Sequence, residues 1–260
     1  MKRKIMISFL LACFVMVSIA YAGESISFKG TSKTGDEFVL KGVLNKPSGQ
    51  GPFPAIVMLS SAKGWSEAWN KWVERFNKWG YVALQVETLA SRGRSSLFDD
   101  GGSWPTFSPR DAAQDAHDAK AYLCGLPYVD GKRVSLIGWF FGGWVVPYAI
   151  DPSESIRNRG SPFRAAIAFD PLCDQPLMGF DSPLLILHGE LDDWHSVARC
   201  RIIEGRSKHE ITLKIYPGAY MAFDLEGMDM TINGHRLLYN PAAAADAFEQ
   251  VKNFLLKYAE

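Results

Sequence analysis

The chain has 260 residues, 47% of them hydrophobic, with acidic and basic side chains in equal number. That is enough apolar material for the core of one large domain. A formal net charge of +0, with no basic patch interleaved with aromatic residues, gives no reason to expect a nucleic-acid partner.

The N-terminus has the layout of a secretory signal peptide. A basic start precedes an apolar run from Ile5 to Ala20, and small residues stand at positions −3 and −1 of a cut before Gly23. A retained membrane anchor is the alternative, although this run is slightly short for a full span. We therefore expect a signal peptide at 1–22, one domain at 23–260, and a periplasmic or secreted product that is not membrane-bound after cleavage.

Export changes how the cysteines are interpreted. Cys13 would leave with the signal, and a lipid anchor on it is disfavoured because apolar residues continue after it. Cys124, Cys173 and Cys200 remain, so one disulfide plus one spare thiol is the simplest arrangement in an oxidising compartment. None of the three has the spacing of a zinc site, and we expect no metal and no cofactor.

The mature chain alternates between predicted strands and helices. A loose alternation over 25–44 predicts an antiparallel hairpin at a sheet edge. Continuous apolar runs predict buried parallel strands at 54–59, 81–86, 134–137, 165–169, 184–188 and 212–216. Helical spacing predicts helices at 66–79, 110–123 and 242–258, and one more after the strand at 134–137. A turn is predicted at 129–133 and a long functional loop at 89–109. This alternation predicts an α/β fold whose mostly parallel sheet has helices on both faces.

One strand-to-helix turn has the glycine frame of a nucleophile elbow. The segment Gly138–Gly143 reads G-W-F-F-G-G, and in the G-x-S-x-G motif the nucleophile stands two residues after the first glycine. Phe140 occupies that position, and a phenyl ring has no nucleophilic atom. A tight turn in a generic α/β protein is the alternative interpretation.

Two later loops stand where the partners of such a nucleophile belong. Asp192 and Asp193 follow the predicted strand at 184–188, where chain order places the acid of a catalytic triad. The segment Tyr216–Asp224 follows the last predicted strand, where the triad histidine belongs.

Taken together, these segments resemble the dienelactone hydrolase family, particularly its exported branch. The likeness runs from about Gly51 to Leu256 and includes GPFPAIVML, WNKWVERFNKWGYVAL, RDAAQDAHDAKAYL, VDGKRVSLIGW, GELDDW, YPGAY followed by AFD, and YNPAAAADAF. The resemblance implies an α/β-hydrolase fold and ester or lactone hydrolysis.

It also implies which residues would carry that chemistry. The family has Ser or Cys where this chain has Phe140 and His where it has Met221, whereas the acid is retained as Asp192, with Asp193 the less suitable equivalent. The oxyanion donors would be the backbone N–H groups of Phe141 and Ala62.

The first predicted parallel strand ends differently from its relatives. They often have a His-Gly pair after it, where this chain has the segment Ser60–Gly64. The resemblance further implies a Cys173–Cys200 disulfide with Cys124 free.

The replaced nucleophile and base favour a protein that binds rather than cleaves, because the usual route needs both groups. We expect a pocket for a small apolar or ester-like ligand, lined by Trp104, Trp139 and Trp194. One alternative is a hydrolase with a displaced nucleophile, Ser60 or Ser61; another is a residual fold without function. Among possible replacement bases, His188 is interpreted as a satisfied core histidine. His195 is interpreted as a surface or supporting residue, and His117, His209 and His235 as surface residues.

Overall fold

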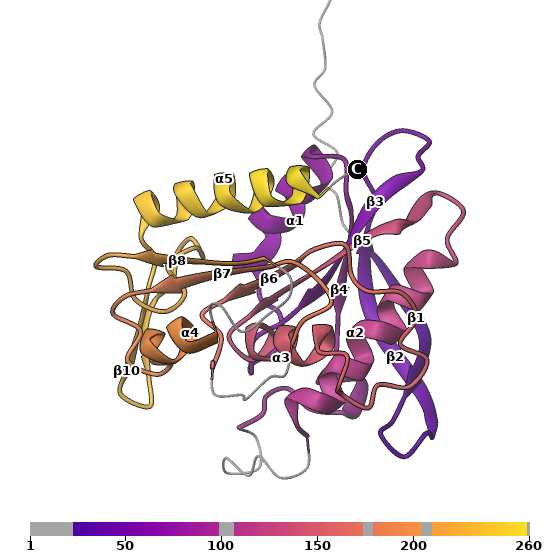
Figure 1. Cartoon of the computed structure of the whole chain (residues 1–260), viewed down its shortest axis with the longest axis horizontal. Helices are drawn as coiled ribbons and strands as arrows, with labels where there is room; N and C mark the ends of the chain where they lie inside the picture. The colour runs from indigo at the N-terminus through magenta and orange to yellow at the C-terminus, as the bar shows by residue number, and fades with distance from the viewer. Residues whose placement is uncertain (1–22, 99–106, 174–178, 204–209, 259–260) are drawn as a thin grey trace, which may run out of the picture.

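A twisted sheet organises the chain in the computed structural model, which describes residues 23–98, 107–173, 179–203 and 210–258 (Figure 1). Its strands are β1 (Glu24–Thr31), β2 (Glu37–Asn45), β3 (Phe53–Leu59), β4 (Val82–Val86), β5 (Val129–Trp139), β6 (Ala166–Phe169), β7 (Leu184–Gly189) and β8 (Ile211–Tyr216). They lie in the order β1-β2-β4-β3-β5-β6-β7-β8. The hairpin β1–β2 is antiparallel and stands at one edge, and all strands from β4 to β8 in this order pair in parallel, as predicted.

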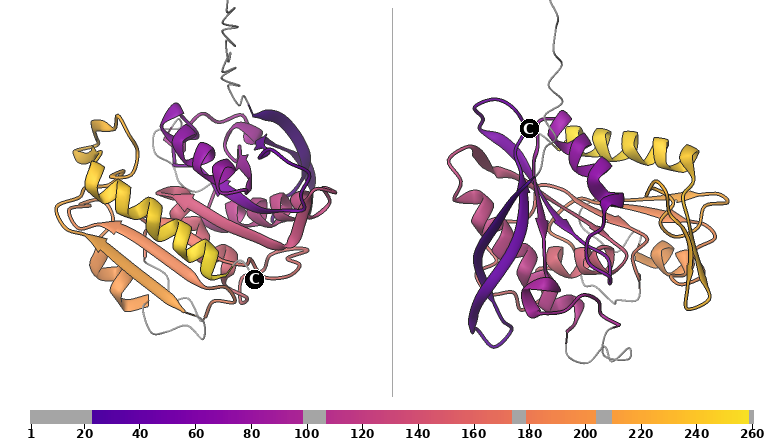
Figure 2. Two further views of the ribbon diagram at one scale, coloured as in Figure 1. Left: turned by 90° about the horizontal axis from the view of Figure 1, so that it is seen from above. Right: turned by 180° about the vertical axis from the view of Figure 1, so that it is seen from behind.

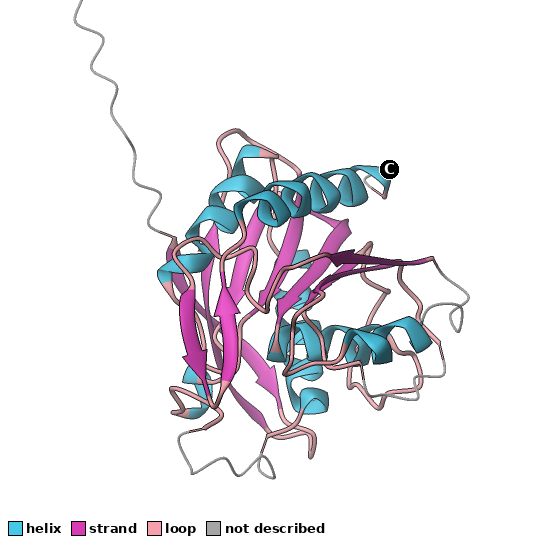
Figure 3. Ribbon diagram, turned by 90° about the vertical axis from the view of Figure 1, so that its left-hand side faces the viewer, coloured by secondary structure: helices cyan, strands magenta, loops and turns pink. Residues whose placement is uncertain are grey.

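Helices cover both faces of this sheet. They are α1 (Asn70–Lys78), α2 (Pro109–Cys124), α3 (Phe141–Ile150), α4 (Val197–Ile203) and α5 (Pro241–Lys257), with short 3₁₀ turns η1 (Glu67–Trp69) and η2 (Ala90–Arg92). Helices α1 and α5 lie side by side on one face, and α2, α3 and α4 cover the other (Figures 2 and 3). Trp72 of α1 and Phe248 of α5 are in ring contact, with centroids 4.6 Å apart.

Two cores result from the alternation of side chains along the strands. In β5, Leu136 packs into the core beneath α2 and α3, and its neighbour Ile137 packs into the core beneath α1 and α5. Because both faces are buried, the central strands are apolar at nearly every position, which is why continuous apolar runs predicted them.

The turn predicted at 129–133 is wrong, because these residues form the first half of β5. Val129 pairs with Phe53 and Val134 pairs with Ala55, so the register shifts between these two pairs. The polar residues between Val129 and Val134 lie in this irregular part of the strand. Helix α4 and a second small sheet, formed by β9 (Asp229–Ile232) and β10 (His235–Leu238), were not predicted. Within the described ranges, no helix combines the length and the apolar character needed to cross a bilayer. The predicted signal peptide and Trp104 lie outside the described residues.

Candidate functional site

The turn between β5 and α3 has the strained backbone of a nucleophile elbow. Phe140 has φ 53° and ψ −105°. Residues other than glycine rarely adopt this backbone conformation, which costs about 1–3 kcal/mol. Its N–H donates to the carbonyl of Phe169 (3.0 Å), and its carbonyl accepts from Trp144 (2.8 Å). A Cβ atom at Gly142 would lie 2.4 Å from the carbonyl oxygen of Leu59, so this position requires glycine. The glycine frame in the sequence therefore predicted a real elbow.

Phe140 projects from this elbow into the wall of a cavity of about 440 Å³ at the carboxyl edge of the sheet. Its ring meets that of Trp69 edge-on, with centroids 6.5 Å apart. The cavity is lined by Ser61, Ala62, Lys63, Gly64, Ser66, Trp69, Phe98, Phe140, Phe141, Trp144, Leu172, Trp194, His195, Met221, Met228, Met230, Ile232 and Leu237. Aromatic, methionine and aliphatic side chains dominate this lining, which is the usual character of a small-molecule pocket.

Met221 lies in the same cavity, after β8, and is buried. Its carbonyl accepts the N–H of Leu238, and the residue bridges to Leu237 of β10. The structure thus brings together the predicted nucleophile and base positions.

The hairpin β9–β10 forms one wall of the cavity with Met230, Ile232 and Leu237. Sequence analysis missed this wall, although Asn233-Gly234 is a strong hairpin signal; both residues have positive φ, 52° and 88°.

Asp192 lies behind the cavity wall rather than in it. Its Oδ1 accepts the backbone N–H groups of Trp194 and His195, each at 2.9 Å, and both of these residues line the cavity. Its Oδ2 is buried and has no hydrogen-bond partner among the described residues. The predicted acid is therefore next to the pocket, but it holds the pocket wall.

His195 lines the cavity, so the surface role expected for it is wrong, whereas the supporting role stays a prediction. Its Nδ1 lies 2.9 Å from the carbonyl of Asp170, and because a carbonyl only accepts, this nitrogen carries the hydrogen. Loop conformation places the ring there, and nothing in the sequence pattern indicated it.

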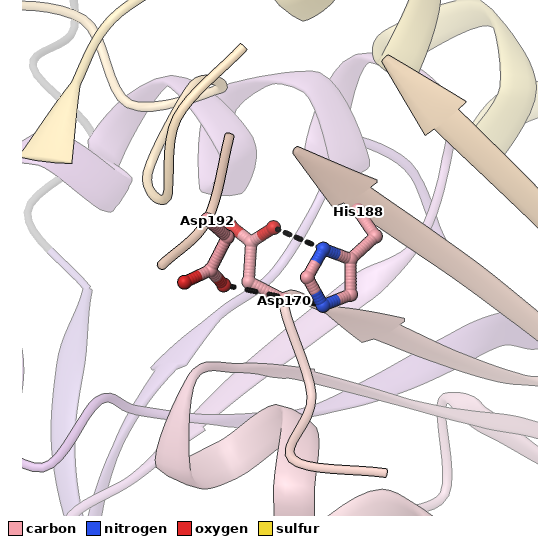
Figure 4. Close-up of side chains that lie close together, drawn as sticks. All are labelled: Asp170, His188 and Asp192. Carbon is pink, nitrogen blue, oxygen red and sulfur yellow. Dashed lines mark ion pairs between the residues drawn. The ribbon is translucent and has the colours of Figure 1, made fainter. Parts of the chain in front are cut away.

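A buried cluster of three titratable side chains stands directly behind this wall (Figure 4). Asp170, His188 and Asp192 each offer an atom within 4.8 Å of the others, and their side chains are wholly buried. Both oxygens of Asp170 already accept backbone N–H groups, from Gly189 (2.9 Å) and Ala222 (3.1 Å). His188 Nδ1 is bonded to the carbonyl of Gly189 (2.9 Å). Among the described residues, His188 Nε2 and Asp192 Oδ2 are the two polar side-chain atoms of this cluster without a hydrogen-bond partner. They are fewer than the three or four protein ligands of zinc, so the cluster fits a hydrogen-bonded protein network better than a metal site.

Burial shifts the pKa values of this region strongly. Burial raises the pKa of Asp170 to about 8, against the opposing hydrogen bond from Gly189. Burial, assisted by the nearby charge of Asp170, raises the pKa of Asp192 to about 7. The pKa of His188 is lowered by burial, and that of His195 is lowered to about 4 for the same reason. At neutral pH His188 and His195 are therefore uncharged.

These shifts predict that the protein loses stability between pH 6.5 and 8.5. In the folded state Asp170 and Asp192 stay protonated up to about pH 8 and pH 7, whereas in the unfolded chain both lose their protons near pH 4. Their contribution to the free energy of unfolding therefore falls as pH rises, until the pH has passed the folded-state pKa values of 7–8. The lowered pKa of His195 stabilises the folded state above pH 6.5, and this stabilisation is lost only as pH falls towards 4. His195 therefore does not change the expected result between pH 6.5 and 8.5. We expect a free energy of unfolding about 1–3 kcal/mol lower at pH 8.5 than at pH 6.5, measured by urea unfolding. A flat or rising profile would contradict this.

Trp139 does not line the pocket, contrary to prediction. It is fully buried in the core beneath α1 and α5, where its ring packs against that of Trp69, a lining residue, with centroids 6.3 Å apart. Its indole N–H donates to Asp224 Oδ2 (2.8 Å), as does that of Trp72 (2.7 Å). Trp194 lies in the pocket as predicted.

The predicted oxyanion residues Phe141 and Ala62 both line the cavity. The N–H of Gly142 donates to the carbonyl of Ser60 (2.9 Å), which fixes the two segments beside each other. The role of their N–H groups stays a prediction.

The two serines considered as displaced nucleophiles are placed differently. Ser61 lines the cavity and Ser60 does not. Their hydroxyls donate to backbone carbonyls, Ser60 to Ser61 (3.3 Å) and Ser61 to Gly64 (3.1 Å), and within the described part of the chain neither is bonded to a histidine.

The predicted disulfide Cys173–Cys200 is confirmed, and Cys124 is free and exposed. The bridge ties the segment after β6 to helix α4. His117, expected at the surface, is buried, with its ring nitrogens 2.8 Å from the carbonyls of Arg159 and Ala149. His188 is in the core as expected, but only one of its ring nitrogens is satisfied. His235 is partly buried and stacks on Trp194, whereas His209 lies outside the described residues.

Solved structures share this architecture. A dienelactone hydrolase-like promiscuous phosphotriesterase, P91, from metagenomic libraries superposes with a TM-score of 0.69 at 20% identity, over 90% of this chain and 98% of its own. Esterase 2 of Thermogutta terrifontis, in its apo form, gives 0.67 at 17% identity, over 90% and 94%. The predicted α/β-hydrolase fold is therefore confirmed.

Sequence comparison identifies the family within that fold. A Synechocystis protein named "Putative carboxymethylenebutenolidase" is 26% identical over 234 residues, which cover 82% of this chain and 89% of that protein. The model of the dienelactone hydrolase family matches residues 40–259. With an elbow, an acid loop and a pocket in the places this family requires, the chain belongs to the dienelactone hydrolase family.

Proposed function

We propose that this chain is a non-hydrolytic member of the family that binds a small apolar or ester-like molecule. The observation that carries the proposal is Phe140, an inert side chain held in the strained elbow conformation with its ring in the cavity wall. An acyl group would have to approach the elbow through the volume that this ring fills. Met221, in the position of the base, accepts no proton at any useful pH.

The rest of the cavity supports binding. Its methionines are flexible and polarizable, and such side chains adapt to ligands of varied shape. Trp194 closes the wall between the acid loop and β10, where it stacks on His235 with centroids 4.7 Å apart. We also propose that the protein acts outside the cytoplasm, which the Cys173–Cys200 disulfide supports.

The neutral fluorophore N-phenyl-1-naphthylamine tests the binding function. We expect saturable one-to-one binding, and we expect Trp194→Ala to weaken it by about tenfold or more, because a large apolar contact is lost. Leu256→Ala is the matched control, since Leu256 is exposed on α5, away from the cavity lining. Equal affinity in both variants would contradict the proposal.

Turnover of short-chain aryl esters tests the alternative. We expect none above the uncatalysed rate. Turnover that disappears in Ser61→Ala, or in Ser60→Ala, would instead identify a hydrolase with a displaced nucleophile.

A further inference from the structure

Two buried polar atoms face each other behind the pocket without any partner. Asp192 Oδ2 and His188 Nε2 are 3.9 Å apart, neither has a hydrogen bond in the described residues, and both side chains are wholly buried (Figure 4). Leaving both unpaired in the core would destabilise the folded protein, because each atom has given up its hydrogen bond to water without a replacement. Asp192 has lost its expected partner, because position 221 carries methionine.

The neighbouring hydrogen bonds show which atom can donate. His188 Nδ1 lies 2.9 Å from the carbonyl of Gly189, so Nδ1 carries the ring hydrogen and Nε2 of the neutral ring has a lone pair. Asp192 Oδ1 accepts two backbone N–H groups, so the free position for a proton on this carboxyl is Oδ2. A proton there makes a donor that faces an acceptor 3.9 Å away.

We propose that Asp192 and His188 form a positioning pair, in which a proton on Asp192 Oδ2 is donated to His188 Nε2 and thereby holds Trp194 and His195 in the pocket wall. The consequence for ligand binding rests on the proposed function, whereas the pair itself does not.

The charged surroundings favour the neutral form of the pair. Burial raises the pKa of Asp192 and lowers that of His188, and both shifts favour a proton on the acid. The opposing influences are the charge of Asp192 and the hydrogen bond to the Gly189 carbonyl, both of which raise the pKa of His188 and favour a charged ring. His195 Nδ1 is 3.7 Å from Asp192 Oδ2 but already donates to the carbonyl of Asp170, so it does not satisfy that oxygen.

Two further titratable groups act on the cluster from neighbouring elements. The charge of Asp224, after β8, raises the pKa of Asp170. His235 of β10 disfavours a charge on His195. Within the described residues neither group is hydrogen-bonded to the pair itself, since His235 Nδ1 is bonded to Asp193 (3.0 Å) and Asp224 accepts from two tryptophans.

The substitution Asp192→Asn tests the pair directly, because an asparagine can keep both sets of bonds. Its Oδ1 can accept the same two N–H groups and its Nδ2 can donate to His188 Nε2. At pH 6 we expect the variant to bind N-phenyl-1-naphthylamine within about twofold of wild type, and Asp192→Ala to bind roughly tenfold more weakly. Asp36→Asn, the same change at an exposed position between β1 and β2 and outside the cavity lining, is the control.

The pH profile separates positioning from a merely structural role. Wild-type affinity is expected to fall roughly three- to tenfold from pH 6 to pH 8.5, because loss of the proton leaves two lone pairs facing each other. The affinity of Asp192→Asn should stay flat across this range. An Asp192→Asn variant as weak as Asp192→Ala would overturn the proposal.

Nitrogen shifts of ¹⁵N-histidine-labelled protein report the pair without any ligand, with the His188 signals assigned through His188→Gln. We expect the neutral Nδ1–H tautomer at pH 6, with Nε2 accepting a hydrogen bond. A ring protonated on Nε2, alone or on both nitrogens, would overturn the proposal. If no variant binds the fluorophore, the proposed function fails, while these shifts still decide whether the pair exists.

Discussion

Replacing Phe140 with serine and Met221 with histidine in one variant is expected to raise hydrolysis of p-nitrophenyl acetate by about 10²- to 10⁴-fold over wild type. The elbow backbone, with φ 53° at position 140, already has the conformation that presents a nucleophile. In its carboxylate form Asp192, whose Oδ2 has no hydrogen bond within the described residues, would exchange His188 for an imidazole at position 221 as its partner. Each single substitution should stay near background, because nucleophile and base act as a unit.

Two further variants control this result. Phe140→Ala with Met221→Ala opens the same space without chemistry and should remain inactive. Adding Asp192→Asn to the reactivated variant should remove most of the gain. Because the pKa of Asp192 is raised to about 7, activity of the reactivated variant should increase as pH rises through 7. A folded but inactive double variant would show that the oxyanion geometry, and not only these two side chains, differs from that of active relatives.

Loss of the Cys173–Cys200 disulfide is expected to lower the free energy of unfolding by about 2–4 kcal/mol. The bridge closes a segment with a sequence separation of 27 residues, which contains β7 and the acid loop, and so restricts the unfolded chain. For a domain of this size the loss corresponds to a fall in Tm of roughly 5–15 °C. Thermal unfolding of Cys173→Ser with Cys200→Ser measures it.

Cys124→Ser is the control for this experiment, since its thiol is exposed and unbridged. Wild type with reductant should behave like the double variant, and reductant should not change the double variant further. Equal Tm values for wild type and double variant would mean that native contacts of α4 alone brace the acid loop.

Much of the fold could be predicted because a strand that is buried on both faces of a sheet is apolar at nearly every position, which is visible in the sequence. The run 54–59 is apolar throughout, and it forms β3 with neighbours on both sides. The turn at 129–133 was mispredicted for the opposite reason. The polar residues at 130–133 suggested that regular structure ends there. Instead β5 already pairs with β3 at Val129, and its pairing continues past a register shift.

The site could be predicted in part. Phe140 was located through the spacing of the elbow motif and Met221 through the resemblance to the family, and the two positions meet in one cavity. Trp139 was misplaced because proximity in sequence to the elbow does not show whether a side chain reaches the cavity; its ring is buried against Trp69, which lines the cavity, and is hydrogen-bonded to Asp224. The cavity wall built by His195 and Met230 depends on how loops pack across long sequence separations, for which periodicity holds no information.

The strained elbow also bears on how such a protein can change over time. Its geometry depends on the glycines and on backbone hydrogen bonds such as the one from Phe140 N–H to Phe169, none of which involves the side chain at position 140. Selection for folding alone therefore preserves a turn shaped for acyl transfer. Phe140 and Met221 are therefore the two side-chain positions at which the proposed binding pocket and a reactive one would differ, on the same backbone frame.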